Sequence, residues 1–152
     1  MLMELLSQKK ASELIDRINR LQPETKGKWG KMTVEEMLIH CAAGIQMAFG
    51  DFPAKLRVSP FRAMVARILF IEIFPFPKRA SAPPEINISK KLKIRMPFSE
   101  ARTLLIEQVI RIQNTPVDHR FQTHPIFNNL SRRQWGKLAY KHLDYHLKQF
   151  GV

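Results

Sequence analysis

Five histidines are the side chains of this 152-residue chain best suited to binding a metal, and two of them, His142 and His146, are four positions apart. In a helix, which turns by about 100° per residue, side chains four apart stack on one face, where two imidazoles can bind the same ion. Trp135, Leu138 and Gln149 fall on the same stripe, so we expect it to face the interior. The spacing therefore predicts a metal site, and the alternative is a pair of hydrogen-bonded core histidines.

A third ligand must come from another helix, and His40 is the best candidate because it lies midway along an apolar helical segment. Cys41 is rotated from it by about 100°, so we expect Cys41 to be a small buried apolar residue rather than a ligand. His119 and His124 fall in a loop containing proline. We expect them to line a pocket rim or to anchor that loop.

The general base cannot be assigned from the sequence, and the catalytic residues are left open. A zincin-type protease has Glu directly after the first histidine, whereas this chain has Leu143 there. Glu36, Asp144 and Tyr145 lie near the candidate ligands. Their simpler interpretations are a capping residue, a solvated acid and a packed ring. Asp144 or a backbone carbonyl is an alternative partner for orienting an imidazole.

The composition is that of a single globular domain, 1–152, with 45% hydrophobic and 25% charged residues. The one cysteine, Cys41, excludes an intrachain disulfide and favours a reducing compartment. We find no secretory leader in the first ten residues, and no uncharged apolar run approaches the roughly 18 residues of a transmembrane segment. These features predict a cytoplasmic protein.

Hydrophobic periodicity and capping residues predict an all-α protein. Helices are expected over 8–21, 33–50, 61–74, from just after Ser99 to about 115, and 131–149, with Thr33–Glu36 and Ser131–Gln134 as capping boxes. Alternation between 86 and 96 predicts a short β-hairpin. The four longer helices suggest a four-helix bundle, with residues 51–98 as a long crossover between its second and third helices.

This crossover is basic and rich in proline. It contains seven of the ten prolines and ten Lys or Arg against three acids, and the whole chain carries a formal charge of +12. Its basic residues and nearby phenylalanines suggest an alternative function, the binding of nucleic acid or an anionic membrane. The basic residues are Lys78, Arg79, Lys90, Lys91, Lys93 and Arg95, and the phenylalanines are Phe70, Phe74 and Phe76. No nucleic-acid-binding motif accompanies them, so we expect an exposed loop that favours an anionic substrate on its way to the histidines. The apolar run 68–76 is expected to cover the bundle or to form a homodimer contact.

Several runs resemble the DinB/YfiT-like superfamily, and more narrowly one of its domain-of-unknown-function subfamilies. They are 29–33 (WGKMT), 37–41 (MLIHC), 124–125 (HP), 135–138 (WGKL) and 142–151 (HLDYHLKQFG). The resemblance implies a four-helix bundle with a long crossover and a divalent metal held by His40, His142 and His146. Two departures concern the substrate pocket: Tyr145 where many relatives have a further His, and Asn128 where they often have Gly after Phe.

Superfamily members include transferases and isomerases that use low-molecular-weight thiols, and hydrolases. Three imidazoles leave positions open for water or substrate, which is typical of catalytic rather than structural sites. Our leading hypothesis is therefore a metal-dependent enzyme that transfers a thiol to a small molecule or hydrolyses one, with Zn, Ni or Fe as the metal, since imidazole suits each of them. A bundle that binds metal without turnover is the alternative.

Overall fold

The computed structural model describes residues 6–78, 82–87 and 93–152, and all regular secondary structure in these ranges is helical. The elements are α1 (Gln8–Arg20), α2 (Val34–Ala48), α3 (Pro60–Arg67), the π-helical segment η1 (Ile68–Ile73), the 3-10 turn η2 (Pro84–Ile86), α4 (Phe98–Gln113) and α5 (Arg132–Gln149). The expected all-α class is confirmed for these residues. None of the helices in the described ranges is both long enough and apolar enough to cross a membrane.

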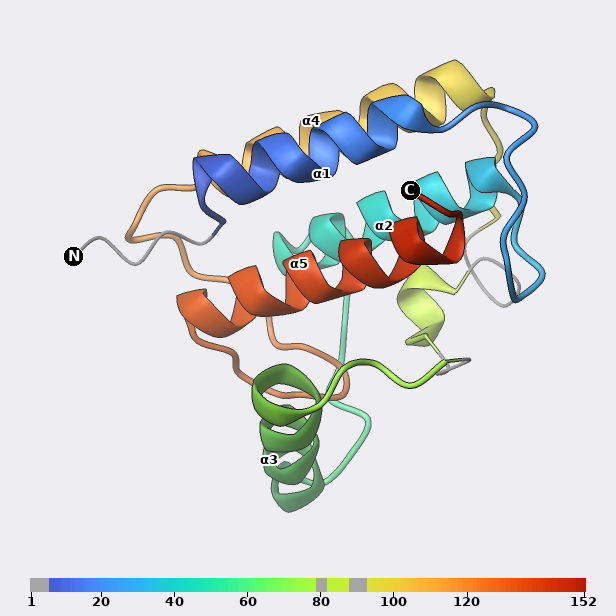
Figure 1. Ribbon diagram of the computed structural model, residues 1–152. Helices are drawn as coiled ribbons and strands as arrows, with labels where there is room; N and C mark the ends of the chain where they lie inside the picture. Colours follow the sequence, from blue (N-terminus) through green and yellow to red (C-terminus); the bar gives the residue numbers. More distant parts are fainter. Residues whose placement is uncertain (1–5, 79–81, 88–92) are drawn as a thin grey trace.

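Four long helices pack around a common core (Figure 1). α4 contacts α1 and α2, and α5 contacts the same two helices. The largest fully buried side chains come from all four: Leu14 and Ile18, Met37 and Leu38, Leu105 and Ile112, Leu143 and Leu147. α2 is buried on most of its surface, as its nearly continuous apolar sequence predicts. The two helices that carry the candidate ligands, α2 and α5, are thus held side by side by the core.

Local capping explains where three of these helices begin. Both capping boxes are formed: the Thr33 hydroxyl accepts from the Glu36 amide and the Glu36 carboxylate accepts from the Thr33 amide, and Ser131 and Gln134 do the same. Ser7 caps α1. The prediction that α4 starts after Ser99 was wrong, because α4 begins at Phe98. Pro97 occupies the N-cap position, and no side chain caps this helix. Proline lacks an N–H and has a fixed φ, which suits it to a helix start.

The predicted hairpin is wrong for the described part of 86–96. Residues 84–86 form a 3-10 turn, the described residues 93–97 have no regular structure, and residues 88–92 lie outside the described ranges. Pro83 and Pro84 start the turn, and Ile86 is buried in the core. The Ile86 carbonyl is 2.6 Å from His40 Nδ1, so it pairs with a side chain instead of a neighbouring strand.

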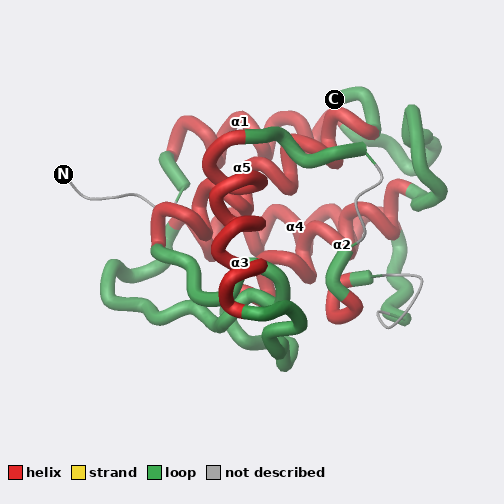
Figure 2. Tube along the Cα trace, turned by 90° about the horizontal axis from the view of Figure 1, so that it is seen from below, coloured by secondary structure: helices red, strands yellow, loops and turns green. Residues whose placement is uncertain are grey.

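α3 and η1 confirm the predicted helical segment 61–74 and run across the direction of the long helices (Figures 1 and 2). Ala63 and Ile71 are its buried residues. Lys141 of α5 donates to the carbonyls of Phe70, Ile71 and Phe74 at 2.8–3.1 Å. These bonds satisfy the free carbonyls at the end of the π-helical segment. η1 is therefore attached to α5, the helix that carries two of the candidate ligands.

Candidate metal centre

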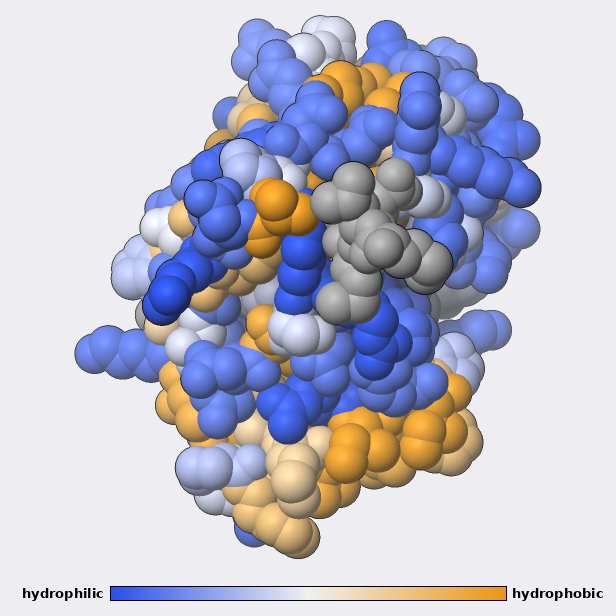
Figure 3. All heavy atoms as spheres, turned by 90° about the vertical axis from the view of Figure 1, so that its left-hand side faces the viewer, coloured by the Kyte–Doolittle hydropathy of each residue, from blue (hydrophilic) through white to orange (hydrophobic). Residues whose placement is uncertain are grey.

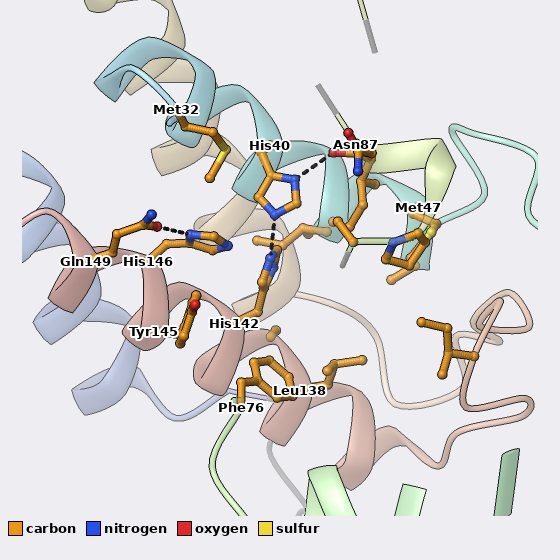
Figure 4. Close-up of a pocket in the computed structure, with 18 of the residues that line it drawn as sticks. Met32, His40, Met47, Phe76, Asn87, Leu138, His142, Tyr145, His146 and Gln149 are labelled. Atoms are coloured by element: carbon orange, nitrogen blue, oxygen red, sulfur yellow. Dashed lines mark hydrogen bonds between the residues drawn. The ribbon is translucent and has the colours of Figure 1, made fainter. Parts of the chain in front are cut away.

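His40 of α2 and His142 and His146 of α5 come together in the structure, as their predicted positions require. One ring nitrogen from each lies within 4.8 Å of those of the other two. Their ring centroids are 4.8–4.9 Å apart, and the rings meet edge to face at 79–81°. Figure 4 shows the three side chains pointing toward one another. The three imidazoles, here called the histidine trio, form a compact cluster of nitrogen donors.

Hydrogen bonds to Nδ1 orient two of the three rings (Figure 4). His40 Nδ1 lies 2.6 Å from the Ile86 carbonyl oxygen, which can only accept, so His40 Nδ1 carries the proton. His146 Nδ1 lies 2.7 Å from Gln149 Oε1, while Gln149 Nε2 donates to the Trp29 carbonyl at 2.7 Å. The amide is therefore oriented with its oxygen toward His146. Both Nε2 atoms are left as lone-pair donors, which is the tautomer that metal binding at Nε2 needs.

His142 completes the cluster through its own Nε2, which lies 2.9 Å from His40 Nε2. Since His40 Nε2 is unprotonated, one proton on His142 Nε2 bridges the two rings. For an ion to bind between the rings, this proton would have to move to His142 Nδ1, which leaves the Nε2 lone pair as the third donor. Gly44 of α2 makes room for the ring, because a Cβ there would lie 3.1 Å from His142 Cε1 and Nδ1.

Burial keeps the trio neutral. It lowers the pKa of His40 below its ordinary value, and it lowers the pKa of His146 to about 3, with the nearby His40 adding to the shift. The pKa of His142 is lowered well below the ordinary value by burial first and then by the neighbouring histidines. Neutral imidazole is the form that binds metal, so no proton has to leave before an ion enters. The donor set thus fits a divalent transition-metal ion.

A cavity of about 830 Å³ adjoins the trio. Most of its lining is apolar and comes from α2, α5, η1 and the loops around them, including Ile45, Met47, Phe76, Phe127 and Leu138. Lys31, Glu36 and Arg95 are the charged side chains among its described lining residues. A small molecule inside would therefore have an apolar environment, with the histidine nitrogens as one of its few polar contacts.

The other predicted candidates lie outside the trio. Cys41 is buried, burial raises the pKa of its thiol, and its Sγ lies 3.7 Å from Met37 Sδ. His119 packs against Phe49 and Phe121. Cys41 is thus the small buried residue that was expected. His119 packs on aromatic rings and is not among the described residues that line the cavity.

None of the three acid or phenol candidates is placed as a free base. Glu36 accepts from the Thr33 amide at 3.0 Å in its capping box. Asp144 pairs with Arg17 and Lys148 at 2.8 Å, and these hydrogen bonds outweigh burial and lower the pKa of its carboxyl group. Tyr145 accepts from Trp29 Nε1 at 3.3 Å and packs edge-on against His146. The residues that orient the imidazoles are instead Ile86, through its carbonyl, and Gln149. Sequence reasoning placed Gln149 on the inward stripe but gave it no role.

His124 anchors its loop and also lines the cavity. Its Nδ1 accepts from the amides of Ile126 and Phe127 at 3.0 and 3.2 Å. The following turn contains Asn128, whose φ is +61°. Asparagine tolerates this left-handed conformation better than other residues with a side chain, apart from Asp. The departure from glycine at this position therefore keeps the same turn available.

We expect the buried His124 to make the protein less stable in acid. Burial lowers its pKa from 6.5 to about 3, so below pH 6.5 the unfolded chain binds a proton that the folded chain does not. Stability is thus retained above this pH and is lost as the pH falls from 6.5 toward 3. His124→Asn keeps an acceptor for the two amides without titrating, and should remove about 2 kcal/mol of the loss between about pH 7.5 and about pH 5. Urea unfolding at the two pH values measures this, and parallel pH profiles for the two proteins would contradict it.

Comparison with known proteins gives a family and no characterised relative. No curated protein and no solved structure matches the chain. One family model, described as a protein of unknown function (DUF1569), matches residues 2–151. Since the match covers nearly the whole sequence, the chain belongs to the DUF1569 family.

Proposed function

We propose that His40, His142 and His146 hold a divalent transition-metal ion, with Zn, Ni or Fe as the candidates. The observation that carries the proposal is the pair of bonds from His40 Nδ1 to the Ile86 carbonyl and from His146 Nδ1 to Gln149. A pair of purely structural core histidines has no need to direct unprotonated nitrogens at one point. Metal-binding histidines almost always have such a partner on the second nitrogen.

We further propose that the chain, 1–152, is one DinB-like four-helix bundle, with residues 51–98 as its crossover. The packing of α1, α2, α4 and α5 around one core supports this. The sequence runs that resemble the DinB/YfiT-like superfamily support it as well, because they include all three histidines of the trio.

The function that the site supports best is a metal-dependent enzyme acting on a small molecule. When bound, the ion would act as a Lewis acid and favour the anionic form of a thiol or another donor near neutral pH. The chain's own residues bind the ion through neutral donors, so its positive charge is left to an anionic ligand. The mostly apolar cavity accommodates the substrate body, and Lys31 and Arg95 line it with positive charge.

A thiol-dependent transferase fits this cavity better than a hydrolase. Among the described residues that line it, Glu36 is the one carboxylate, and it already accepts the Thr33 amide in the capping box. Both nucleophiles must lose a proton. A metal-bound thiol, whose free pKa is already about 8.5, releases its proton to solvent near neutral pH more fully than metal-bound water, whose pKa is lowered only to about 7. We therefore place a low-molecular-weight thiol as the first candidate substrate. A metal-binding bundle without turnover is the second candidate function.

Metal content tests the proposal. Protein purified without a histidine tag or added metal is expected to contain about one equivalent of a transition metal by elemental analysis. After chelation, Co²⁺ titration should end at the same stoichiometry with visible absorption from nitrogen coordination. A chain that takes up no stoichiometric metal under either condition is not a metalloprotein.

Addition of benzenethiol to the Co²⁺-loaded protein separates the candidate functions. A thiolate-to-metal charge-transfer band in the near ultraviolet is expected for a thiol-dependent enzyme. Metal binding without such a band would favour the hydrolase or the metal-binding bundle that lacks turnover.

A further inference from the structure

An apolar face is exposed on the segment formed by α3, η1 and Phe74, residues 60–74, here called the α3–η1 arm. Its exposed large apolar side chains are Phe61, Met64, Val65, Ile68, Ile73 and Phe74. Phe61 is 69% exposed and Phe74 is 54% exposed. Figure 3 shows hydrophobic residues gathered at the end of the molecule where α3 lies in Figure 1, with hydrophilic residues above them. Contiguous apolar surface of this kind marks an interaction site.

Polar contacts on the opposite side fix this face outward. Lys141 donates to three carbonyls of the arm, and Glu72 accepts from Arg133 and Lys137 at 2.8 and 2.6 Å. Ile71 is fully buried beneath. The arm cannot turn its apolar face to the core without breaking these contacts. Its exposure therefore belongs to the folded state.

The surroundings of the arm are positively charged. The arm itself has two arginines, Arg62 and Arg67, and one acid, Glu72, and the first ten residues of α5, to which the arm is bonded, add four Lys or Arg and no acid. Glu72 is paired with two of these cations. A partner must therefore offer both negative charge and an apolar interior.

We propose that the α3–η1 arm docks the protein on an anionic lipid bilayer. Phe61, Phe74 and the aliphatic side chains between them enter the boundary between headgroups and acyl chains, while the positive charge of the arm and of α5 behind it attracts the lipid phosphates. A second copy of this chain meets the apolar requirement but carries the same +12 charge, which opposes its approach. Nucleic acid meets the charge but leaves Met64, Val65 and Ile68 without an apolar partner.

Vesicle co-sedimentation of the full chain tests this assignment. Binding is expected to vesicles of phosphatidylcholine mixed with phosphatidylglycerol, to weaken steeply as salt is raised, and to be weak on phosphatidylcholine alone. The Phe61→Ser, Phe74→Ser double variant should lower the partition coefficient by at least about tenfold. Both side chains are exposed, so circular dichroism and metal content should not change.

Ile110→Ser is the matched control, because Ile110 is also an exposed apolar residue, 42% exposed, and lies on α4, away from α3 in Figure 1. It should bind vesicles as the wild-type chain does. Equal losses in the two variants, or no binding to anionic vesicles at low salt, would overturn the proposal. So would a concentration-dependent dimer, or retention on DNA, that the double phenylalanine variant abolishes. The outcome does not depend on the metal, so the proposed function stands or falls separately.

Discussion

The His142→Ala, His146→Ala double variant is expected to lose its stoichiometric metal while keeping its fold. It removes two of the three nitrogen donors of the trio and leaves His40, and one imidazole does not hold a divalent ion against water. The apparent affinity for Zn²⁺ should fall on the order of a thousandfold or more. Elemental analysis and competition titration with a chromophoric chelator measure the loss.

Its controls separate metal binding from folding. His119→Ala removes a histidine that packs against Phe49 and Phe121 outside the trio, and it should keep the full metal content. The double variant itself leaves Gln149 Oε1 without the His146 donor, which costs about 1–3 kcal/mol of unfolding free energy. Circular dichroism and urea unfolding of the metal-free proteins show whether it is folded. A folded double variant with unchanged stoichiometry would remove the histidine trio as the metal site.

Gln149→Met should weaken metal binding by about 10–100-fold, although Gln149 offers no nitrogen lone pair of its own. In the structure its oxygen accepts from His146 Nδ1 and its nitrogen donates to the Trp29 carbonyl. Methionine has a similar shape and makes neither bond well. His146 is then free to rotate or to protonate at Nε2, and either change takes its lone pair away from the ion. Competition titration with Zn²⁺ measures the change in affinity.

Gln149→Glu distinguishes orientation of the histidine from simple packing. A carboxylate still accepts from His146 Nδ1 and increases the basicity of the ring, but it cannot donate to the Trp29 carbonyl. We expect near-wild-type or tighter Zn²⁺ binding together with a loss of about 1–3 kcal/mol in unfolding free energy. If Gln149→Met and Gln149→Glu lose the same affinity, the role of Gln149 is structural and our assignment is wrong.

Gly30 shows how closely this orienting bond is built into the fold. Its φ is +82°, and a Cβ at this position would lie 2.6 Å from Gln149 Nε2. A side chain would therefore both strain the turn and displace the amide that orients His146. Gly30 belongs to the run 29–33 (WGKMT), which is one of the runs that resemble the superfamily. The turn at Gly30 brings the Trp29 carbonyl to Gln149, which is a physical reason for glycine in this run.

Local signals in the sequence were enough to predict the long helices and the inward face of α5. The capping boxes Thr33–Glu36 and Ser131–Gln134 are formed, because each depends on residues only three positions apart. Trp135 and Gln149 are buried on the stripe that carries His142 and His146, because helical periodicity alone determines which residues share a face. Two local predictions failed. Pro97 and not Ser99 occupies the cap position of α4, and in the predicted 86–96 hairpin the Ile86 carbonyl pairs with the distant His40 side chain.

Long-range packing decided the rest. His40 meets the α5 pair because α2 lies beside α5, and its proton lies on Nδ1 because the Ile86 carbonyl, 46 positions away, accepts it. The bond from Gln149 to the Trp29 carbonyl spans 120 positions. The apolar face of the α3–η1 arm is exposed because Lys141 and the buried Ile71 hold the other side of the arm against the rest of the protein. Periodicity and capping operate within a few residues, so the sequence by itself determined the helices and the spacing of the donors. The direction of each lone pair and of each exposed apolar face depends on which elements meet in space, and only the tertiary structure decided that.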